Sequence, residues 1–156
     1  MTIIAGGQTG VDRAALDFAI QYGIEHGGWC PAGRWAEDAT IPMQYRLRET
    51  ESGDPAERTE QNVIDSDATV IIARERSLSG GTRLTEKCCE GHNKPLLVLL
   101  ESDGVAEAAR QLRTFVSENA VMVLNVAGPR ESEAPGLGAF VHRVLGQAFS
   151  GKDSEI

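Results

Sequence analysis

Four short runs of apolar residues recur along the chain, and each contains four to six residues. They are Thr2–Ala5, Ala68–Ala73, Leu96–Leu100 and Val121–Val126. Their apolar character is continuous rather than alternating, which is typical of strands covered on both faces in a parallel sheet. The pattern therefore predicts four buried strands.

Between these runs, apolar residues recur at helical spacing. A stripe from Val11 to Tyr22 stops at Gly23, which favours the end of a helix there. Asp54-Pro55-Ala56-Glu57 resembles a capping box with proline in the first helical position, and it predicts a helix to about Asp65. Further helices are expected from Thr82 to about His92, from Val105 to Val116 and from Leu137 to Leu145.

Strands that alternate with helices predict βαβ units. We therefore expect an α/β fold: one doubly wound, mostly parallel, Rossmann-like sheet with helices on both faces. The 156 residues suit a single ligand-binding domain, placed at 1–149, followed by a flexible tail at 150–156.

The segment from Cys30 to Gly53 shows neither the continuous apolar runs of the expected strands nor the helical spacing of apolar residues. It is rich in Pro, Gly, charged and aromatic residues, and a loop of this length in a compact domain is usually functional or disordered. Trp29 and Trp35 flank its start and Tyr45 lies inside it. Because aromatic residues favour packing, we expect an ordered loop.

Glycine-rich turns follow three of the expected strands. The first run leads into Gly6-Gly7-Gln8-Thr9-Gly10 and then into a helix, and the second is followed by Ser79-Gly80-Gly81-Thr82. The third candidate is the turn around Gly128, after Val121–Val126. Neither the dinucleotide-binding fingerprint nor a P-loop is present, and a tight turn that needs positive φ is an alternative explanation for any one of them.

Parallel strands all end at one edge of their sheet, so these turns should meet there. Glycines let a ligand approach the backbone closely, and helix N-termini offer free N–H groups to an anion. A phosphate-bearing ligand is the first hypothesis. The expected binding residues are Gly6, Gly7, Gln8, Thr9, Gly10, Asp12, Ser79, Gly80, Gly81, Thr82, Gly128 and Glu131.

Several charged side chains lie near these turns. Asp12 stands in the first turn of its helix, where a carboxylate either caps the helix or contacts a ligand hydroxyl or a metal. Four arginines could bind phosphate in a bidentate manner or simply be solvated: Arg13, Arg58, Arg83 and Arg130.

The composition narrows the choice of partners. With 15 Lys and Arg against 23 Asp and Glu, the chain carries a net charge of −8, so nucleic acid is not an expected partner. No apolar stretch is long enough to span a bilayer, and we expect a cytoplasmic protein. Three cysteines do not make a disulfide framework, no metal-ligand spacing is present, and core packing is the expected role of Cys30, Cys88 and Cys89.

Five segments together resemble the molybdenum carrier family. They are GGQTGVDRAALD at 6–17, GGWCPAGR at 27–34, ERTEQNV at 57–63, SGGT at 79–82 and NVAGPRES at 125–132. That family is similar to the lysine-decarboxylase-like and "lonely guy" Rossmannoid proteins. The resemblance implies a carrier that binds molybdenum cofactor, a pterin with a terminal phosphate, or a nucleotide, without a metal ligated directly by the protein.

The lonely-guy relatives imply an alternative, an enzyme that cleaves nucleoside monophosphates with a PGGxGTxxE motif. Aligned on Gly81 and Thr82, the motif places Thr85 where the catalytic Glu belongs, and Glu86 stands one residue later. An N-glycosidase would then use Glu86 or Glu131, assisted by Arg58 or Arg83.

A nucleotide-sensing module that acts on another protein would use the same site.

The superfamily relatives, and helix faces that carry Ala and Cys, indicate a homodimer or higher homo-oligomer. Binding, catalysis and sensing therefore all remain open from the sequence, with the site at the carboxyl edge of the sheet common to the three.

Overall fold

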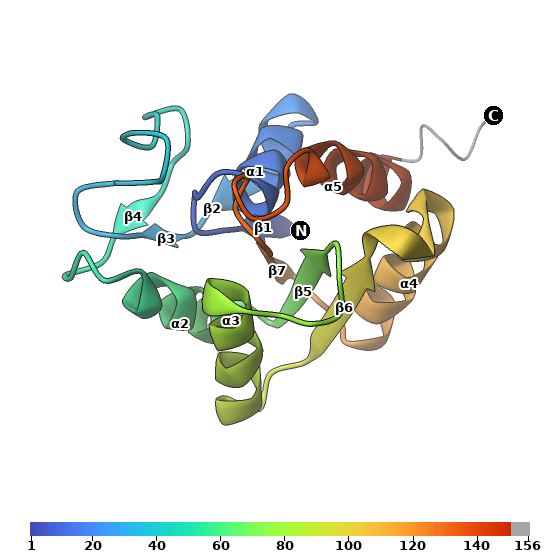
Figure 1. Cartoon of the computed structure of the whole chain (residues 1–156). Coiled ribbons are helices and arrows are strands. Elements are labelled where there is room, and N and C mark those ends of the chain that lie inside the picture. The colour runs from blue at the N-terminus through green and yellow to red at the C-terminus, as the bar shows by residue number, and fades with distance from the viewer. Residues whose placement is uncertain (151–156) are drawn as a thin grey trace.

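The computed structural model describes residues 1–150, and its centre is a five-stranded sheet in which all strands are parallel. The strand order is β2-β1-β7-β5-β6 (Figure 1). The strands are β1 Thr2–Ile4, β2 Glu25–Gly27, β5 Ala68–Ala73, β6 Leu96–Leu100 and β7 Val123–Ala127.

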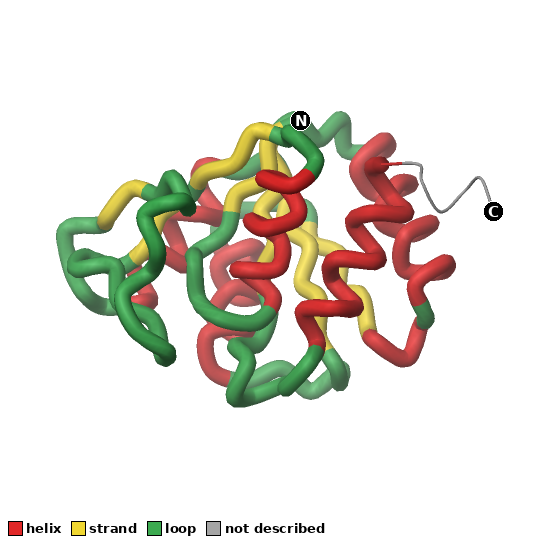
Figure 2. The backbone as a smooth tube through the Cα atoms, turned by 90° about the horizontal axis from the view of Figure 1, so that it is seen from above, coloured by secondary structure: helices red, strands yellow, loops and turns green. Residues whose placement is uncertain are grey.

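Helices cover both faces of this sheet. They are α1 Val11–Gln21, α2 Pro55–Asp65, α3 Gly80–Gly91, α4 Val105–Glu118 and α5 Leu137–Leu145, with a 3₁₀ turn at Glu101–Asp103 and a π-helical turn at Gly146–Ser150. The helices α1, α4 and α5 lie on one face, and α2 and α3 pack together on the other (Figures 1 and 2). The predicted Rossmann-like α/β fold is therefore confirmed.

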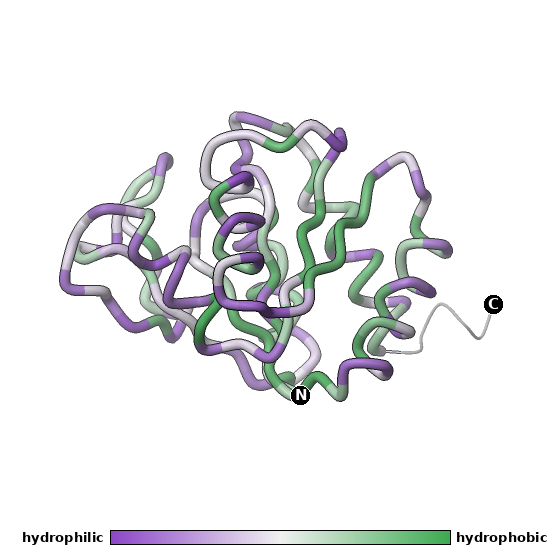
Figure 3. Tube along the Cα trace, turned by 90° about the horizontal axis from the view of Figure 1, so that it is seen from below, coloured by the Kyte–Doolittle hydropathy of each residue, from purple (hydrophilic) through white to green (hydrophobic). Residues whose placement is uncertain are grey.

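The continuous apolar runs follow from this two-sided cover. All six residues of β5 are buried, because helices pack on both of its faces. The largest core cluster joins the central strands to α1, α4 and α5, and Figure 3 shows the most hydrophobic residues concentrated along those strands. A smaller cluster of Val63, Cys88 and Cys89 joins α2 to α3.

The strand order decides where the site forms. The last strand, β7, lies between β1 and β5, with Ile4 opposite Asn125 and Val70 opposite Val126. The carboxyl ends of three neighbouring strands therefore lie side by side. Ligands of open α/β sheets bind at such a point, where the strand order reverses.

Some strand limits differ from the prediction. The runs at 68–73 and 96–100 are strands as expected, but β7 begins at Val123 instead of Val121. The carboxylate of Asp67 accepts hydrogen bonds from the N–H groups of Met122 (2.9 Å) and Val123 (2.8 Å), which ends the preceding loop there. The edge strand β2 was not predicted, because its sequence Glu-His-Gly has no apolar run.

The helix starts also differ in detail. Asp54 caps α2 as predicted, since its carboxylate accepts from the N–H of Ala56 at 3.0 Å, but Glu57 accepts from Ser52 at 3.2 Å rather than closing a capping box with Asp54. The helix α3 begins at Gly80, two residues before Thr82. Ser150 belongs to the π-helical turn, and the remainder of the expected tail, 151–156, lies outside the described residues.

The long loop is ordered around one buried cation. Arg34, which is 8% exposed, donates hydrogen bonds to the carbonyl groups of four loop residues: Ile41 (3.2 Å), Pro42 (2.8 Å), Tyr45 (3.0 Å) and Leu47 (3.4 Å). Ala36, Ile41 and Tyr45 of the loop form a small core with Ala5, Leu16 and Cys30. The short parallel strands β3 Trp29–Cys30 and β4 Arg48–Glu49 pair at the base of the loop.

Within residues 1–150, no helix combines the length and the apolar character needed to cross a membrane.

The turn after β7 should tolerate no side chain at Gly128. A Cβ atom there would clash with the carbonyl oxygen of Ile72 and lie 2.7 Å from Val11 Cγ2. Gly128→Ala should therefore lower the free energy of unfolding by about 1–3 kcal/mol through overpacking, measured by urea denaturation.

Gly91→Ala is the matched control, because nothing lies within 4 Å of a Cβ atom at Gly91 in α3. This substitution should leave stability unchanged or raise it by up to about 1 kcal/mol. Equal effects at the two positions would contradict the packing described for the third turn.

Candidate functional site

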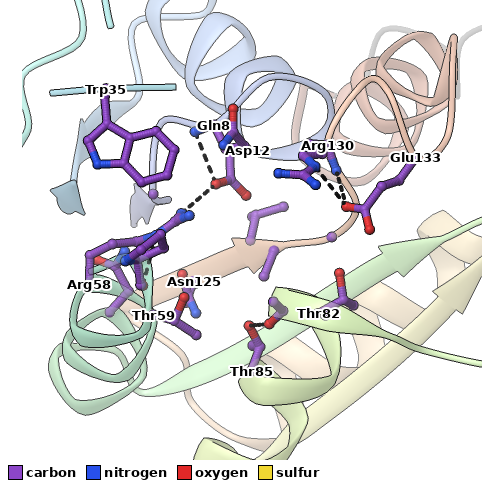
Figure 4. Close-up of a pocket in the computed structure, with 18 residues that line it drawn as sticks. Gln8, Asp12, Trp35, Arg58, Thr59, Thr82, Thr85, Asn125, Arg130 and Glu133 are labelled. Carbon is purple, nitrogen blue, oxygen red and sulfur yellow. Dashed lines mark hydrogen bonds and ion pairs between the residues drawn. The ribbon is translucent and has the colours of Figure 1, made fainter. Parts of the chain in front are cut away.

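The three glycine-bearing turns meet in one cleft at the carboxyl edge of the sheet. The cleft has a volume of about 240 Å³ and is open to solvent on one side. Figure 4 shows its polar side chains, with Trp35 and Arg58 on one side and Arg130 and Glu133 on the other. Its lining is Gly6, Gln8, Asp12, Trp35, Pro55, Arg58, Thr59, Asn62, Gly80, Gly81, Thr82, Thr85, Asn125, Val126, Ala127, Gly128, Arg130 and Glu133.

In the first turn, between β1 and α1, several backbone N–H groups have acceptors within the protein. The N–H of Gln8 donates to Asp12 Oδ2 (3.2 Å), and the N–H of Thr9 donates to Gln8 Oε1 (3.0 Å). The N–H of Val11 donates to the carbonyl of Pro129 in the third turn at 3.3 Å. The start of α1 therefore already has acceptors from within the protein.

Only part of the predicted first turn lines the cleft. Gly6, Gln8 and Asp12 do so, whereas Gly7, Thr9 and Gly10 do not. Gly10 has φ +80°, and a Cβ atom there would lie 2.6 Å from the carbonyl oxygen of Pro129. This glycine therefore allows the first and third turns to pack against each other.

A buried ion pair closes one side of the cleft. Arg58 of α2 donates to Asp12 Oδ2 at 3.1 Å, and the exposed fractions of the two side chains are 14% and 8%. The guanidinium group lies over Gly6, where a Cβ atom would clash with it. Burial raises the pKa of Asp12 above its ordinary value, and the charge of Arg58 is the main influence that opposes the rise.

The second turn, at the start of α3, is arranged differently. Ser79 precedes the helix without a side-chain capping hydrogen bond, and within residues 1–150 no group accepts from the N–H of Gly80, Gly81 or Thr82. Gly80 has φ +54°, which favours glycine, but Gly81 has no such φ, and a Cβ atom there would meet nothing within 4 Å. Gly80, Gly81 and Thr82 line the cleft, whereas Ser79 lines a neighbouring pocket, to which Thr82 also contributes.

The third turn contributes Arg130 and Glu133 to the cleft as well as the predicted Gly128. The backbone N–H of Arg130 donates to Glu133 Oε1 at 3.4 Å. The predicted Glu131 lies outside this cleft, because its carboxylate accepts from the N–H of Gly136 at 2.8 Å.

The carboxylate proposed for catalysis on α3 also lies outside the cleft. Glu86 pairs with Arg83 and, at 3.5 Å, with Arg76, and neither Glu86 nor Arg83 lines the cleft. Thr85 takes the place that the family alignment gives to a Glu, and its hydroxyl donates to the carbonyl of Gly81 at 3.0 Å. The one-residue offset turns Glu86 away from the cleft.

Helix α2 supplies lining residues that the sequence reasoning missed. Pro55, Thr59 and Asn62 accompany Arg58, and their spacing of three and four residues places them on one face of the helix. Polar side chains at this spacing were the sequence signal that could have predicted the contribution of α2 to the cleft. Asn62 also fastens α2 to β3, since its amide exchanges hydrogen bonds with the N–H (2.8 Å) and carbonyl (3.0 Å) of Trp29.

Two further residues line the cleft although the sequence did not predict them there. Asn125 is the polar residue within the apolar β7 run, and its buried amide donates to Thr69 Oγ1 at 3.2 Å. Trp35 comes from the long loop and is 43% exposed at the mouth of the cleft. The other two aromatic residues of this region do not line the cleft: the indole N–H of Trp29 donates to Asp65 at 2.6 Å, and the hydroxyl of Tyr45 donates to Asp17 at 2.5 Å.

The remaining arginines and the cysteines have structural partners. Arg13 donates to the carbonyl of Gly7 and pairs with Asp38 at 2.7 Å. Cys30, Cys88 and Cys89 are buried, as expected, and burial raises the pKa of each thiol. Within the described part of the chain, no three His, Cys, Asp or Glu side chains gather closely enough to hold a metal ion.

Comparison with known proteins agrees with this architecture. Residues 3–149 match the family described as circularly permutated YpsA SLOG. A solved structure titled "Putative molybdenum carrier protein" from Syntrophus aciditrophicus SB is 42% identical, with a TM-score of 0.92 over 95% of this chain and 94% of that one. No curated protein matches the chain.

The ion pair between Asp12 and Arg58 gives a prediction for stability. Arg58→Ala should leave the Asp12 carboxylate buried without its main cation and lower the free energy of unfolding at pH 7 by about 3–5 kcal/mol. Burial already raises the pKa of Asp12 and loss of Arg58 should raise it further, so the electrostatic part of this loss should shrink as the pH falls and Asp12 becomes protonated in both folded proteins. Urea denaturation between pH 4 and 7 measures it.

The double variant Asp12→Asn with Arg58→Ala is the control, since it removes the unpaired charge and should recover most of the lost stability. If the double variant were as unstable as the single one, or if the loss did not depend on pH, the ion pair would not have the role described.

Proposed function

This chain belongs to the circularly permutated YpsA SLOG family, and from that premise and the geometry of the cleft we propose that it binds a small phosphorylated heterocycle, molybdenum cofactor or a nucleotide, as a carrier. The phosphate lies at the N-terminus of α3. The heterocyclic ring lies toward Trp35.

The observation that carries this proposal is the start of α3, where backbone donors lack acceptors from the described part of the protein. Three consecutive N–H groups face the cleft without an acceptor from residues 1–150, and the helix dipole adds a positive potential there. The protein's own packing does not require a glycine at Gly81. A glycine at this position has a purpose if a ligand approaches the backbone closely.

The charges around the cleft suit the same ligand. Arg58 and Arg130 stand on opposite sides of it, in a protein whose net charge is −8. Arg130 is 47% exposed, and its other contacts are long, 3.4 Å to Glu37 and 3.5 Å to Glu133, so its guanidinium group is available to a phosphate.

The size of the cleft limits the ligand. Its volume of about 240 Å³ lies just below the roughly 300–1,000 Å³ of typical ligand pockets, so a large ligand extends out of the open mouth past Trp35. The indole ring offers a flat surface on which a pterin or a base stacks. The name of the 42% identical neighbour, which refers to a molybdenum carrier, supports the pterin cofactor as cargo.

An N-glycosidase is the second candidate, and one observation favours it. Glu133 lines the cleft and supplies a carboxylate, although Glu86 and Glu131 do not. Its paired neighbour Arg130 and its position in the third turn suit ligand contact as well as proton transfer. We place binding first, because the aligned catalytic position holds Thr85.

The two candidates differ in what happens to a bound nucleotide. As a carrier, the protein should release no free base from AMP or from a panel of nucleoside monophosphates, measured by chromatography after prolonged incubation. Release of base that is lost in Glu133→Gln and kept in Glu86→Gln would instead establish the enzyme.

A substitution at Gly81 tests the phosphate position. Gly81→Ala adds a methyl group toward the open cleft, so it should weaken binding of AMP or the pterin cofactor at least about tenfold, measured by calorimetry, while leaving the free energy of unfolding unchanged or slightly higher.

Gly91→Ala, in the last turn of the same helix, is the matched control and should bind as tightly as the unmodified protein. Equal affinities of the two variants would show that the phosphate does not bind at the start of α3. Absence of binding to any nucleotide or pterin cofactor by the unmodified protein would overturn the proposed function.

A further inference from the structure

One carboxylate of the long loop joins that loop to two of the three turns that form the cleft. The residue is Glu37, and its side chain accepts hydrogen bonds from the hydroxyl of Thr9 (2.6 Å), the N–H of Ser132 (3.0 Å) and the hydroxyl of Ser132 (2.6 Å). Arg130 Nε lies 3.4 Å from the same group. Thr9 belongs to the first turn and Ser132 and Arg130 to the third, so Glu37 connects the loop to both.

The backbone of Glu37 adds another connection. Its N–H donates to Gln8 Oε1 at 3.0 Å, and this oxygen also accepts from the N–H of Thr9. The hydroxyl of Thr9 in turn accepts from the N–H of Glu131 at 3.1 Å. Hydrogen bonds from Ser132 and Thr9 lower the pKa of Glu37, so the group is ionised at neutral pH.

Trp35 stands two residues before this anchor. Its indole N–H donates to the carbonyl of Gly53 at 3.0 Å, and Trp35 forms an isolated antiparallel bridge with Thr40. The ring is therefore held by Gly53 on one side and by the segment through Glu37 on the other. Because 43% of Trp35 is exposed, packing alone does not fix its position.

We propose that Glu37 is a positioning residue that fixes Trp35 as the ring-binding wall of the cleft, and that it thereby determines affinity for the heterocyclic part of the ligand without determining affinity for the phosphate. This inference rests on the proposed function for its binding aspect. The N–H groups at the start of α3, where we propose that the phosphate binds, make no contact with Glu37 within residues 1–150. Arg130 is the one proposed phosphate-binding group that contacts Glu37, and in Glu37→Ala it loses an anionic partner, so its affinity for phosphate should not fall.

The cradle around Glu37 has a consequence that a general stabilising role would not have. Two hydroxyls, one backbone N–H and one guanidinium group converge on a single carboxylate, so in Glu37→Ala they surround a space that fits a small carboxylate ion. Added acetate should then replace the missing side chain. Asp38, paired with Arg13, still fastens the loop in this variant and keeps the protein folded.

The experiment follows Trp35 and ligand affinity together. Fluorotryptophan is incorporated into the whole chain, which has two Trp residues, and Trp35→Phe assigns the Trp35 fluorine signal. In Glu37→Ala this signal should shift and its solvent isotope effect should increase, and acetate should reverse both changes while sodium chloride at the same ionic strength should not. Glu51→Ala, an exposed carboxylate of the same loop, should leave the signal unchanged.

Binding is measured with two probes, AMP and inorganic phosphate. Glu37→Ala should weaken the binding of AMP about tenfold, because base–aromatic stacking is lost. It should not weaken the binding of phosphate. Glu37→Gln, which retains the size of the side chain, should have an intermediate effect. Acetate should restore the affinity of Glu37→Ala for AMP.

Three results would overturn the inference: Glu37→Ala behaving like Glu51→Ala, a parallel loss of affinity for AMP and phosphate, or failure of acetate to restore the Trp35 signal. If the unmodified protein binds neither probe, the proposed function is wrong. The fluorine measurement still decides in that case whether Glu37 fixes Trp35.

Discussion

The N–H groups at the start of a helix need hydrogen-bond acceptors, and the helices α1 and α3, which both begin beside the cleft, differ in how far the protein supplies them. In the turn before α1, Asp12 and Gln8 accept from the N–H groups of Gln8 and Thr9, and at the first residue of the helix the carbonyl of Pro129 accepts from the N–H of Val11. At α3, residues 1–150 supply none for Gly80, Gly81 and Thr82. The start of α1 is therefore tied into the protein's own packing, and the start of α3 is where we propose that the phosphate of a ligand binds.

The same difference makes the proposed anionic ligand compatible with an acidic protein. The net charge of −8 disfavours a polyanion on the surface, but local donors dominate within the cleft. The carboxylates near it are engaged: Asp12 by Arg58, Glu37 by Ser132 and Thr9, and Glu131 by the N–H of Gly136. Backbone N–H groups do not appear in a count of charged residues, so the composition could not reveal the site.

The sequence was sufficient for the fold, because continuous apolar runs are local signals, and residues of the three glycine turns that it indicated line one cleft. It could not separate glycines by purpose: Gly10 and Gly128 permit backbone packing between turns, and Gly81 faces open space. Those roles depend on β7 lying between β1 and β5, which chain order does not reveal. The contact between Glu37 and Ser132 spans 95 residues and has no sequence pattern that would predict it.

The most direct test of the central claim is a titration of the ¹⁵N-labelled protein with AMP, followed by amide NMR signals. The account predicts the largest shifts at the N–H groups of Gly80, Gly81 and Thr82, with the indole N–H of Trp35 following at the same ligand concentrations. The amides of Gln8 and Thr9, which already have acceptors, should move little. Shifts concentrated at the start of α1 with none at the start of α3 would contradict the account.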